Sequence, residues 1–426
     1  MEISVIKEDF IHYAWKYKLY DFSSLVTEKD ETIEVIQPGL HNSNAGPDFL
    51  NAKIKIGDIL FVGNVEMHIN SSDWYNHKHQ TDKAYENVIL HVVLNNDKPV
   101  FNAQNQPIPC LEITPFLHPG AVEKYHILMD GKRRIPCETL LIENPISDTS
   151  FWLERLVVER MIEKSARILE TLEKTKSDWE TTAYITFMRY LGSGLNNDAF
   201  QQLAENTPLS VLRKNNFQPL AIEALLFGQA GFLEKEADAY SEQLRKEYLY
   251  QQQKYNLTAL HSGCWKFSKI RPSGFPTLRL AYMAALIVSD AEFFQNLLKC
   301  NTAEQVNNVL EVPLPEYWQQ HYHFGKKTAR KVNPIGKGFM QNVTINVVAP
   351  LRFAYATYLG NEEEREIAIE LLHQCKPEVN GVVDMWSELG VNANDAAESQ
   401  ALIHLKKLYC DKKKCLNCGF SKHLLS

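Results

Sequence analysis

The chain has 426 residues, of which 45% are hydrophobic and 11% aromatic, and this apolar content excludes a disordered protein. The length exceeds that of one ordinary core, so two or three domains are expected. A formal net charge of −7 excludes a protein that coats nucleic acid with its whole surface, although a local basic groove stays open. Because the sequence has no signal-peptide pattern and no apolar run of about 18 residues, we expect a cytoplasmic protein with no membrane partner.

The first part of the chain is rich in strand patterns after an opening helix. Residues 8–21 carry apolar side chains at helical spacing. Residues 49–70 hold two alternating runs joined at Gly57-Asp58, which predicts a β-hairpin. The apolar run at 87–97 predicts a buried strand. Residues 1–135 are therefore expected to form a mixed α/β domain with a central sheet.

The second part of the chain changes to helical periodicity. Residues 150–174 predict a long amphipathic helix, and further helical runs follow it. The stretch 129–149 carries Pro, Gly and charged residues, as a domain boundary does. We predict a helical domain over 148–426 that ends in a cysteine-rich tail. The fold class is then α+β, with a sheet domain followed by a mostly α-helical part.

Two carboxylates and a histidine of the predicted hairpin are candidates for one site. Successive side chains of a strand alternate between its faces, so Glu66 and His68 share a face. Asp48 follows a Gly-Pro bend, and the hairpin that begins there returns the chain through Glu66. Asp48 and Glu66 can therefore lie side by side, where Mg²⁺ or Mn²⁺ would relieve the repulsion of two ionised carboxylates. A half-exposed strand with a polar face is the plain structural alternative.

This layout resembles the PD-(D/E)xK nuclease superfamily. The matching residues are Pro47-Asp48, a gap of seventeen residues, and then Glu66-Met67-His68. The resemblance implies that Asp48 and Glu66 hold the metal ion, that Glu8 of the opening helix adds a further acid, and that a water attacks a phosphodiester in line. His68 departs from the pattern because it occupies the lysine position. A histidine there can act as a base or ligand but has no permanent charge.

A second cluster follows directly in the sequence. His77 and His79 are flanked by Asp73 and Asp82, and such groups suit a transition metal. The alternative is a polar turn, since Ser71-Ser72-Asp73 is also an ordinary helix cap. His91 lies within the apolar run and is interpreted as a hydrogen-bonded core histidine.

The last cysteines suggest a metal site at the C-terminus. Cys410, Cys415 and Cys418 have the spacing C-x₄-C-x₂-C, and closely spaced thiols favour chelation of Zn²⁺ or of an iron–sulfur cluster. The fourth ligand stays open, with the candidates being His423, Cys375 and Cys264. The arrangement is loosely similar to the C-terminal cluster loops of helix-hairpin-helix DNA glycosylases and of iron–sulfur nucleases. Reduced, unliganded thiols are the alternative.

Basic residues gather in two stretches of an otherwise acidic chain, where they can follow a phosphate backbone with aromatic rings beside them. A solvated face or an ordinary loop is the alternative for each stretch. The candidate DNA-contacting residues are Lys266, Lys269, Arg271, Arg279, Lys326, Lys327, Arg330 and Lys331.

Several long segments resemble the domain-of-unknown-function family 2851. They are the segment from Gly46 to Val93 and those at 271–281, 342–355 and 399–418. The resemblance covers the full chain and implies no particular activity. From the residues, the leading hypothesis is a metal-dependent nuclease or related phosphodiesterase acting on DNA. The alternatives are a nucleic-acid-binding protein that has lost catalysis and a metal-binding structural protein.

Overall fold

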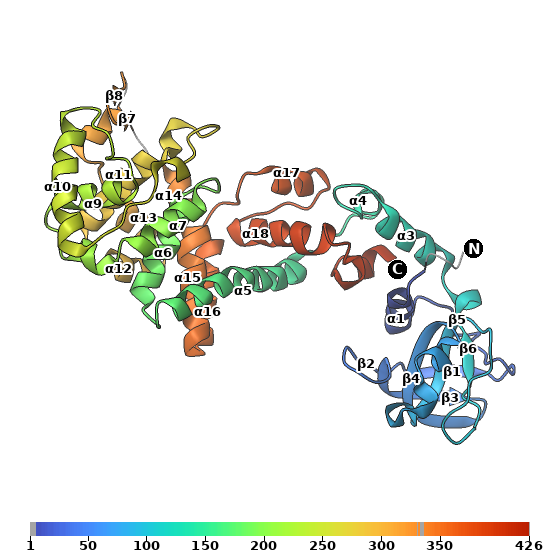
Figure 1. The fold of residues 1–426 in the computed structure, drawn as a ribbon. Helices are drawn as coiled ribbons and strands as arrows, with labels where there is room; N and C mark the ends of the chain where they lie inside the picture. The colour runs from blue at the N-terminus through green and yellow to red at the C-terminus, as the bar shows by residue number, and fades with distance from the viewer. Residues whose placement is uncertain (1–5, 330, 333–335, 426) are drawn as a thin grey trace. The chain divides into compact units, whose positions relative to one another are not determined.

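The computed structural model describes residues 6–329, 331–332 and 336–425, which divide into two compact units (Figure 1). The first unit comprises residues 6–152, 385–391 and 405–425, and the second comprises the residues between them. A sheet lies in the first unit and the second is mostly helical, so the predicted α+β class is confirmed. Among the helices of these described ranges, none combines the length and the apolar character needed to cross a membrane.

The first unit is built on one mixed sheet. Its helix α1 (Glu8–Tyr17) precedes the strands, and the short helices α3 (Pro119–Asp130) and α4 (Glu138–Glu143) follow them. The strands run in the order β1-β3-β4-β5-β6, and β2 pairs with β3. Their bounds are β1 (Ile33–Gln37), β2 (Leu40–His41), β3 (Phe49–Ile56), β4 (Ile59–Asn70), β5 (Val88–Asn95) and β6 (Cys110–Glu112).

The sheet changes from antiparallel to parallel at β4. The predicted hairpin joins β3 to β4 through Gly57-Asp58, with Ile56 paired to Ile59. The next connection is a crossover made of α2 (Asp73–Asn76), η2 (His79–Thr81) and η3 (Lys83–Tyr85), which brings β5 parallel to β4. A parallel neighbour places the crossover residues over the sheet near the end of β4. The histidines of this crossover can therefore meet side chains of β4.

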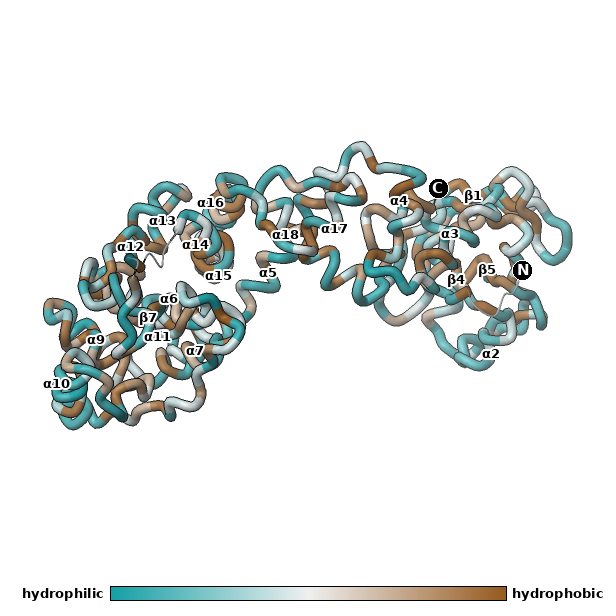
Figure 2. The backbone as a smooth tube through the Cα atoms, turned by 90° about the horizontal axis from the view of Figure 1, so that it is seen from above, coloured by the Kyte–Doolittle hydropathy of each residue, from teal (hydrophilic) through white to brown (hydrophobic). Residues whose placement is uncertain are grey.

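The central strands are covered on both faces. In β4 the consecutive side chains of Val65, Glu66, Met67 and His68 are all buried, whereas a half-exposed strand would alternate. Helix α1 packs on β4, and β5 shows as an apolar run in the hydropathy colouring of Figure 2. Glu66 and His68 of β4 therefore lie in the interior. The alternative of a half-exposed strand with a polar face is wrong for these residues.

A β-bulge in β3 determines what lies beside Glu66. Ala52 pairs with Gly63 but Phe49 pairs with Val65, so three steps along β3 match two along β4. A regular ladder continued from the turn would set Asp48 opposite Met67, on the other face of the sheet. The extra residue shifts the register and brings Asp48 beside Glu66 instead.

Asn51 forms the bulge with a positive φ of 57°, a conformation that asparagine and glycine tolerate. We expect Asn51→Gly to change the free energy of unfolding by less than about 0.5 kcal/mol. Asn51→Val should lower it by about 1–2 kcal/mol, because a β-branched residue is strained at this φ. Urea unfolding followed by circular dichroism measures both. Equal stability of the two variants would contradict the conformational role of the bulge.

The second unit is a set of packed helices with one small hairpin. Helix α9 is buried along most of its length and packs between α10 and α11. Gly228 permits this approach, since a Cβ there would lie 2.1 Å from the ring of Tyr248. The principal elements are α5 (Ser150–Lys174), α6 (Trp179–Leu191), α7 (Asn197–Asn206), α8 (Leu209–Arg213), α9 (Pro219–Gln229), α10 (Ala239–Tyr255), α11 (Pro276–Ser289), α12 (Phe293–Lys299), α13 (Ala303–Leu310), β7 (His321–His323), β8 (Lys326–Lys327), α14 (Lys337–Val343), η8 (Thr344–Val348), α15 (Ala349–Leu359), α16 (Glu362–His373), α17 (Gly381–Glu388) and α18 (Ala396–His404).

The C-terminal tail belongs to the first unit, although the sequence pattern groups it with the helices before it. It consists of η9 (Leu405–Cys410), η10 (Cys415–Asn417) and α19 (Ser421–Leu425). Tyr13 of α1 donates a hydrogen bond to Ser421 at 3.0 Å, and the Lys413 ammonium donates to the Met129 carbonyl at 2.6 Å. These contacts join residues far apart in the chain, so no local pattern could have indicated them.

Candidate metal centre

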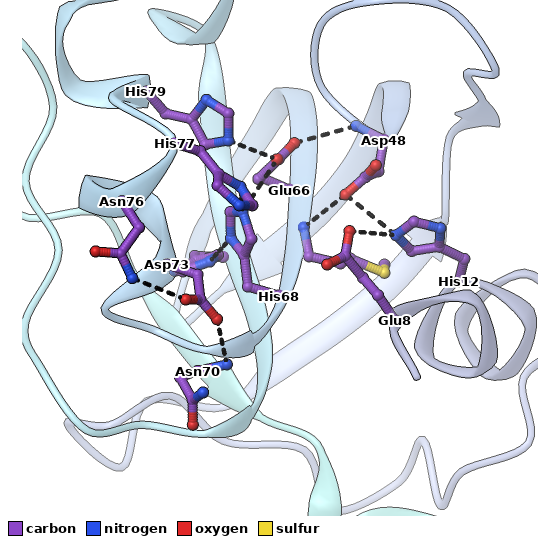
Figure 3. Close-up of polar contacts among 12 residues, drawn as sticks. Glu8, His12, Asp48, Glu66, His68, Asn70, Asp73, Asn76, His77 and His79 are labelled. Atoms are coloured by element: carbon purple, nitrogen blue, oxygen red, sulfur yellow. Dashed lines mark hydrogen bonds and ion pairs between the residues drawn. The ribbon is translucent and has the colours of Figure 1, made fainter. Parts of the chain in front are cut away.

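The two predicted carboxylates lie side by side (Figure 3). The backbone N–H of Asp48 donates to Oε2 of Glu66 at 3.2 Å, and the N–H of Met67 donates to Oδ2 of Asp48 at 2.9 Å. Each carboxylate is thus held by the backbone of the neighbouring strand. The main chain positions both groups, so their proximity does not depend on flexible side-chain contacts.

Helix α1 adds an acid and a histidine to this pair. Nε2 of His12 lies 3.3 Å from Oδ2 of Asp48 and 3.7 Å from Oε1 of Glu8. Residues four apart share one face of a helix, which is why Glu8 and His12 both point at Asp48. The three side chains offer ligand atoms that lie within 4.8 Å of one another. The predicted position of Glu8 agrees with this arrangement. His12 was missed, although its i+4 spacing from Glu8 was a usable signal.

A histidine group forms on the other side of Glu66. His68, His77 and His79 also offer ligand atoms within 4.8 Å of one another. Nε2 of His68 and Nδ1 of His77 are 3.0 Å apart. Oε1 of Glu66 lies 3.2 Å from Nε2 of His79 and 3.6 Å from Nε2 of His68. The Glu66 carboxylate therefore contacts the histidine group with one oxygen and the Asp48 backbone with the other.

The flanking aspartates Asp73 and Asp82 form hydrogen bonds within the crossover and do not belong to either group of ligand atoms found in the described residues. Asp73 accepts hydrogen bonds from the backbone N–H of Asn70 at 3.2 Å and from the side chain of Asn76 at 3.0 Å. Asp82 caps η3 by accepting from the N–H of Ala84. These are the turn and cap contacts that aspartate commonly makes. The aspartates thus make the turn contacts that one alternative predicts, and the histidines gather as the metal-site alternative requires, which leaves that alternative a prediction.

Aromatic rings hold His79 in place. Tyr85 stacks on its imidazole with centroids 3.8 Å apart, and Trp74 meets it edge to face at 5.4 Å. Trp74 is fully buried, and its indole N–H donates to the carbonyl of Phe101 at 3.2 Å. A rigid aromatic wall leaves the imidazole few alternative rotamers.

His91 of the neighbouring strand β5 contacts the imidazole of His68 and fixes its orientation. It pairs with Glu66 in the register of β4 and β5, and it is fully buried. Its Nε2 lies 2.8 Å from Nδ1 of His68, so one of these nitrogens donates and the other accepts. A partner on the far nitrogen is what positions a ligand histidine in metal proteins. The interpretation of His91 as a hydrogen-bonded core histidine agrees with this contact.

The electrostatics favour neutral His68 and His91 and a protonated Glu66 in the absence of a cation. Burial, with a smaller contribution from Asp48, raises the pKa of Glu66. Burial and the neighbouring histidines lower the pKa of His68 to about 2, and burial lowers the pKa of His91 to about 3. Burial by itself would lower the pKa of His12, but the adjacent Asp48 carboxylate raises it. Neutral imidazoles keep the lone pair that binds a metal.

The donor set fits a divalent cation. Nε2 of His79 is buried without a hydrogen-bond partner among the described residues, and it faces the Glu66 carboxylate. Imidazole nitrogens suit Zn²⁺, Mn²⁺ and Fe²⁺, and carboxylates suit Mg²⁺ and Mn²⁺. A cation would bind this buried lone pair and at the same time favour the ionised form of Glu66.

The predicted DNA-contacting residues lie in the second unit and differ in exposure. Arg279 of α11 is only 7% exposed, and its guanidinium packs over the ring of Phe339 at 4.1 Å. The buried position of α11 removes this side chain from any phosphate backbone, so a DNA contact by Arg279 is not supported. Arg330 lies outside the described residues. The exposed members of the set are Lys266, Lys269, Arg271, Lys326, Lys327 and Lys331.

The tail cysteines Cys410, Cys415 and Cys418 line one cavity of the first unit. Cys264 and Cys375 lie in the second unit. His423 is exposed and is absent from the side chains lining the cavity that Cys410, Cys415 and Cys418 share.

The chain matches one family model over residues 8–381, which covers the sheet domain and most of the helical part. The family is described as a protein of unknown function, DUF2851. No curated protein and no solved structure matches the chain. The extent of the family match shows that this chain belongs to the DUF2851 family.

Proposed function

We propose that the first unit is a metal-dependent phosphodiester hydrolase that acts on DNA. The observation that carries this proposal is the pairing of Asp48 with Glu66 across adjacent strands, with Glu8 of α1 completing the acid set. Carboxylates grouped in this way bind the hard divalent cations used in phosphoryl chemistry. The resemblance of Pro47-Asp48 and Glu66-Met67-His68 to the PD-(D/E)xK pattern supports the same reaction.

The ligand sets on the two sides of Glu66 suggest where cations bind. Glu8, His12 and Asp48 form one set, and the imidazoles of the histidine group form the other. Glu66 has an oxygen toward the second set and lies beside Asp48 of the first. Bound divalent cations would acidify a water and offset the charge that develops on the phosphate oxygens.

Other side chains of the protein would bind the metal ion and contact the phosphates of the substrate. His68 occupies the lysine position, but its pKa of about 2 makes its imidazole a weak proton acceptor, so its neutral Nε2 is suited to bind a cation with the histidine group and not to act as the base. Its Nδ1 contact with His91 would hold the ring in the orientation that a ligand needs. Exposed lysines such as Lys266 and Lys327 of the second unit would supply phosphate contacts without sequence preference.

The proposal is tested with Asp48→Asn. The purified full chain is incubated with Mg²⁺ or Mn²⁺ and with supercoiled plasmid, linear duplex, single-stranded DNA and a small activated phosphodiester. We expect metal-dependent hydrolysis by the wild type and a loss on the order of 100-fold in Asp48→Asn, because the asparagine keeps the shape but removes the ligand charge.

Asp58→Asn is the matched control. Asp58 is exposed in the turn of the same hairpin, so the same chemical change is made away from the site. Its rate should equal that of the wild type. Equal rates for Asp48→Asn and the wild type would overturn the proposed site. Stoichiometric metal binding with no hydrolysis of any of the four substrates would overturn the hydrolase and favour the metal-binding alternative.

A further inference from the structure

A fourth cysteine joins the three of the tail in one cavity. Cys137 is the N-cap residue of α4, and it lines an interior space together with Cys410, Cys415 and Cys418. All four belong to the first unit, and none is in a disulfide. The helical unit separates Cys137 from the tail in the sequence, so the tail by itself shows only three of the four cysteines.

The four thiols that share this cavity also act on one another electrostatically. Burial is the main cause that raises the pKa of Cys137, and the next causes are Cys418 and Cys415. Burial likewise raises the pKa of Cys410, followed by Cys137, Cys418 and Cys415. Without a positive ion these thiols stay protonated, whereas a metal centre would take them as thiolates and release their protons.

The backbone around the tail cysteines is well anchored. The N–H of Cys418 donates to the carbonyl of Cys415 at 3.0 Å, and the hydroxyl of Ser421 donates to the carbonyl of Cys418 at 2.6 Å. Lys413 adopts a positive φ of 49° between Cys410 and Cys415, which turns the chain back on itself. Ser421 is in turn held by Tyr13 of α1. The loop is therefore shaped by contacts that do not involve the thiols.

The shape of the site favours a cluster over a single zinc ion. Sulfur atoms around one tetrahedral Zn²⁺ lie about 3.8 Å apart, given Zn–S bonds of about 2.3 Å. Among the described residues, the groups whose ligand atoms all lie within 4.8 Å of one another include no cysteine. A cluster core is larger than one ion and keeps its ligands further apart. The rest of the lining is mainly apolar and would shield a cluster from water, with Leu128, Pro136, Trp386, Phe420 and Leu424.

We propose that Cys137, Cys410, Cys415 and Cys418 bind a [4Fe–4S] cluster that ties the C-terminal tail to α3 and α4. The tail already contacts one of these elements, since α19 packs on α3. Binding releases four thiol protons and closes a loop that spans the whole second unit. The cluster is thus a structural clamp on the unit that carries Asp48 and Glu66, and its assignment does not depend on the hydrolase.

The test measures iron and acid-labile sulfide in the full chain purified without oxygen. About four of each per chain are expected in the wild type, with a broad visible absorption that reductant bleaches. Cys137→Ser should reduce the iron to below about one per chain. Cys375→Ser is the control, because Cys375 is a buried thiol outside the cavity, and it should retain the full amount.

A second measurement covers the case in which Cys137→Ser fails to fold. Alkylation of the native wild-type protein followed by mass spectrometry should leave Cys137, Cys410, Cys415 and Cys418 unmodified, and acid release of the iron should make all four reactive. Stoichiometric zinc in place of iron, full iron in a folded Cys137→Ser variant, or a metal-free wild type purified without oxygen would each overturn the proposal.

Discussion

Replacing Glu66 with glutamine is expected to abolish metal-dependent hydrolysis while making the metal-free protein more stable. Glu66 is only 4% exposed and lies beside Asp48, so its ionised form is disfavoured in the folded chain. Glutamine keeps an oxygen that can accept from the Asp48 N–H and has no charge to bury. We expect a gain of about 1–2 kcal/mol at pH 8, or a rise in Tm of about 2–6 °C. Differential scanning calorimetry with a chelator measures it.

The pH dependence of this gain provides the control. The pKa of Glu66 is raised above its ordinary value of 4.5, so the folded state binds more protons than the unfolded state above that pH. The wild type therefore loses stability as pH rises from 4.5 through the raised pKa, and Glu66→Gln does not. The two proteins should have equal Tm values near pH 4 and diverge toward pH 8. A variant less stable than the wild type at pH 8 would show that the carboxylate is a structural group.

The affinity for Mn²⁺ is expected to rise by about tenfold per pH unit between pH 6 and pH 8. A cation needs the ionised form of Glu66, so binding must release its proton as long as the pH lies below its raised pKa. His68 adds nothing to this slope, because its pKa of about 2 leaves it neutral throughout. His12, whose pKa is raised beside Asp48, makes the dependence steeper wherever its imidazole is still protonated. Isothermal titration calorimetry gives the affinity at each pH.

The number of protons released identifies their source. Titrations in two buffers with different ionisation enthalpies give this number directly, and Glu66→Gln should release about one proton fewer than the wild type. The comparison uses the slope and the proton count, so it holds even if the variant binds Mn²⁺ more weakly. An affinity independent of pH from 6 to 8 would contradict the proposed role of Glu66 as a buried ligand.

The parts of the site that the sequence predicted are those linked by short stretches of chain. Asp48 and Glu66 are joined by one hairpin, whose turn and alternating strands are local patterns. His77 and His79 follow within the same crossover, and His68 follows Glu66 on the same strand face. Glu8 came from the family resemblance and not from spacing. The fold class was also predictable, because strand and helix periods differ over windows of ten to twenty residues.

Other parts depended on contacts that no local pattern encodes. His12 joins the site only because α1 packs on β4. Cys137 lines one cavity with the tail cysteines although the whole helical unit lies between them in the sequence. Arg279 had the charge and the aromatic neighbours of a DNA-contacting residue. Arg279 is nevertheless buried, because other helices enclose α11. The sequence could not show this, since the same apolar pattern also fits the end of a helix at the surface.

The sequence by itself determined the α+β organisation, the hairpin and the acidic pair as candidates, since each follows from periodicity or from spacing along a few residues. The tertiary structure decided whether the pair could function together. An unbroken ladder from Gly57-Asp58 would have turned Asp48 to the face opposite Glu66, and the bulge at Asn51 reverses this. One extra residue in a strand moves every side chain beyond it, counted from the turn, to the other face of the sheet. Only the pairing of the two strands shows where this extra residue lies.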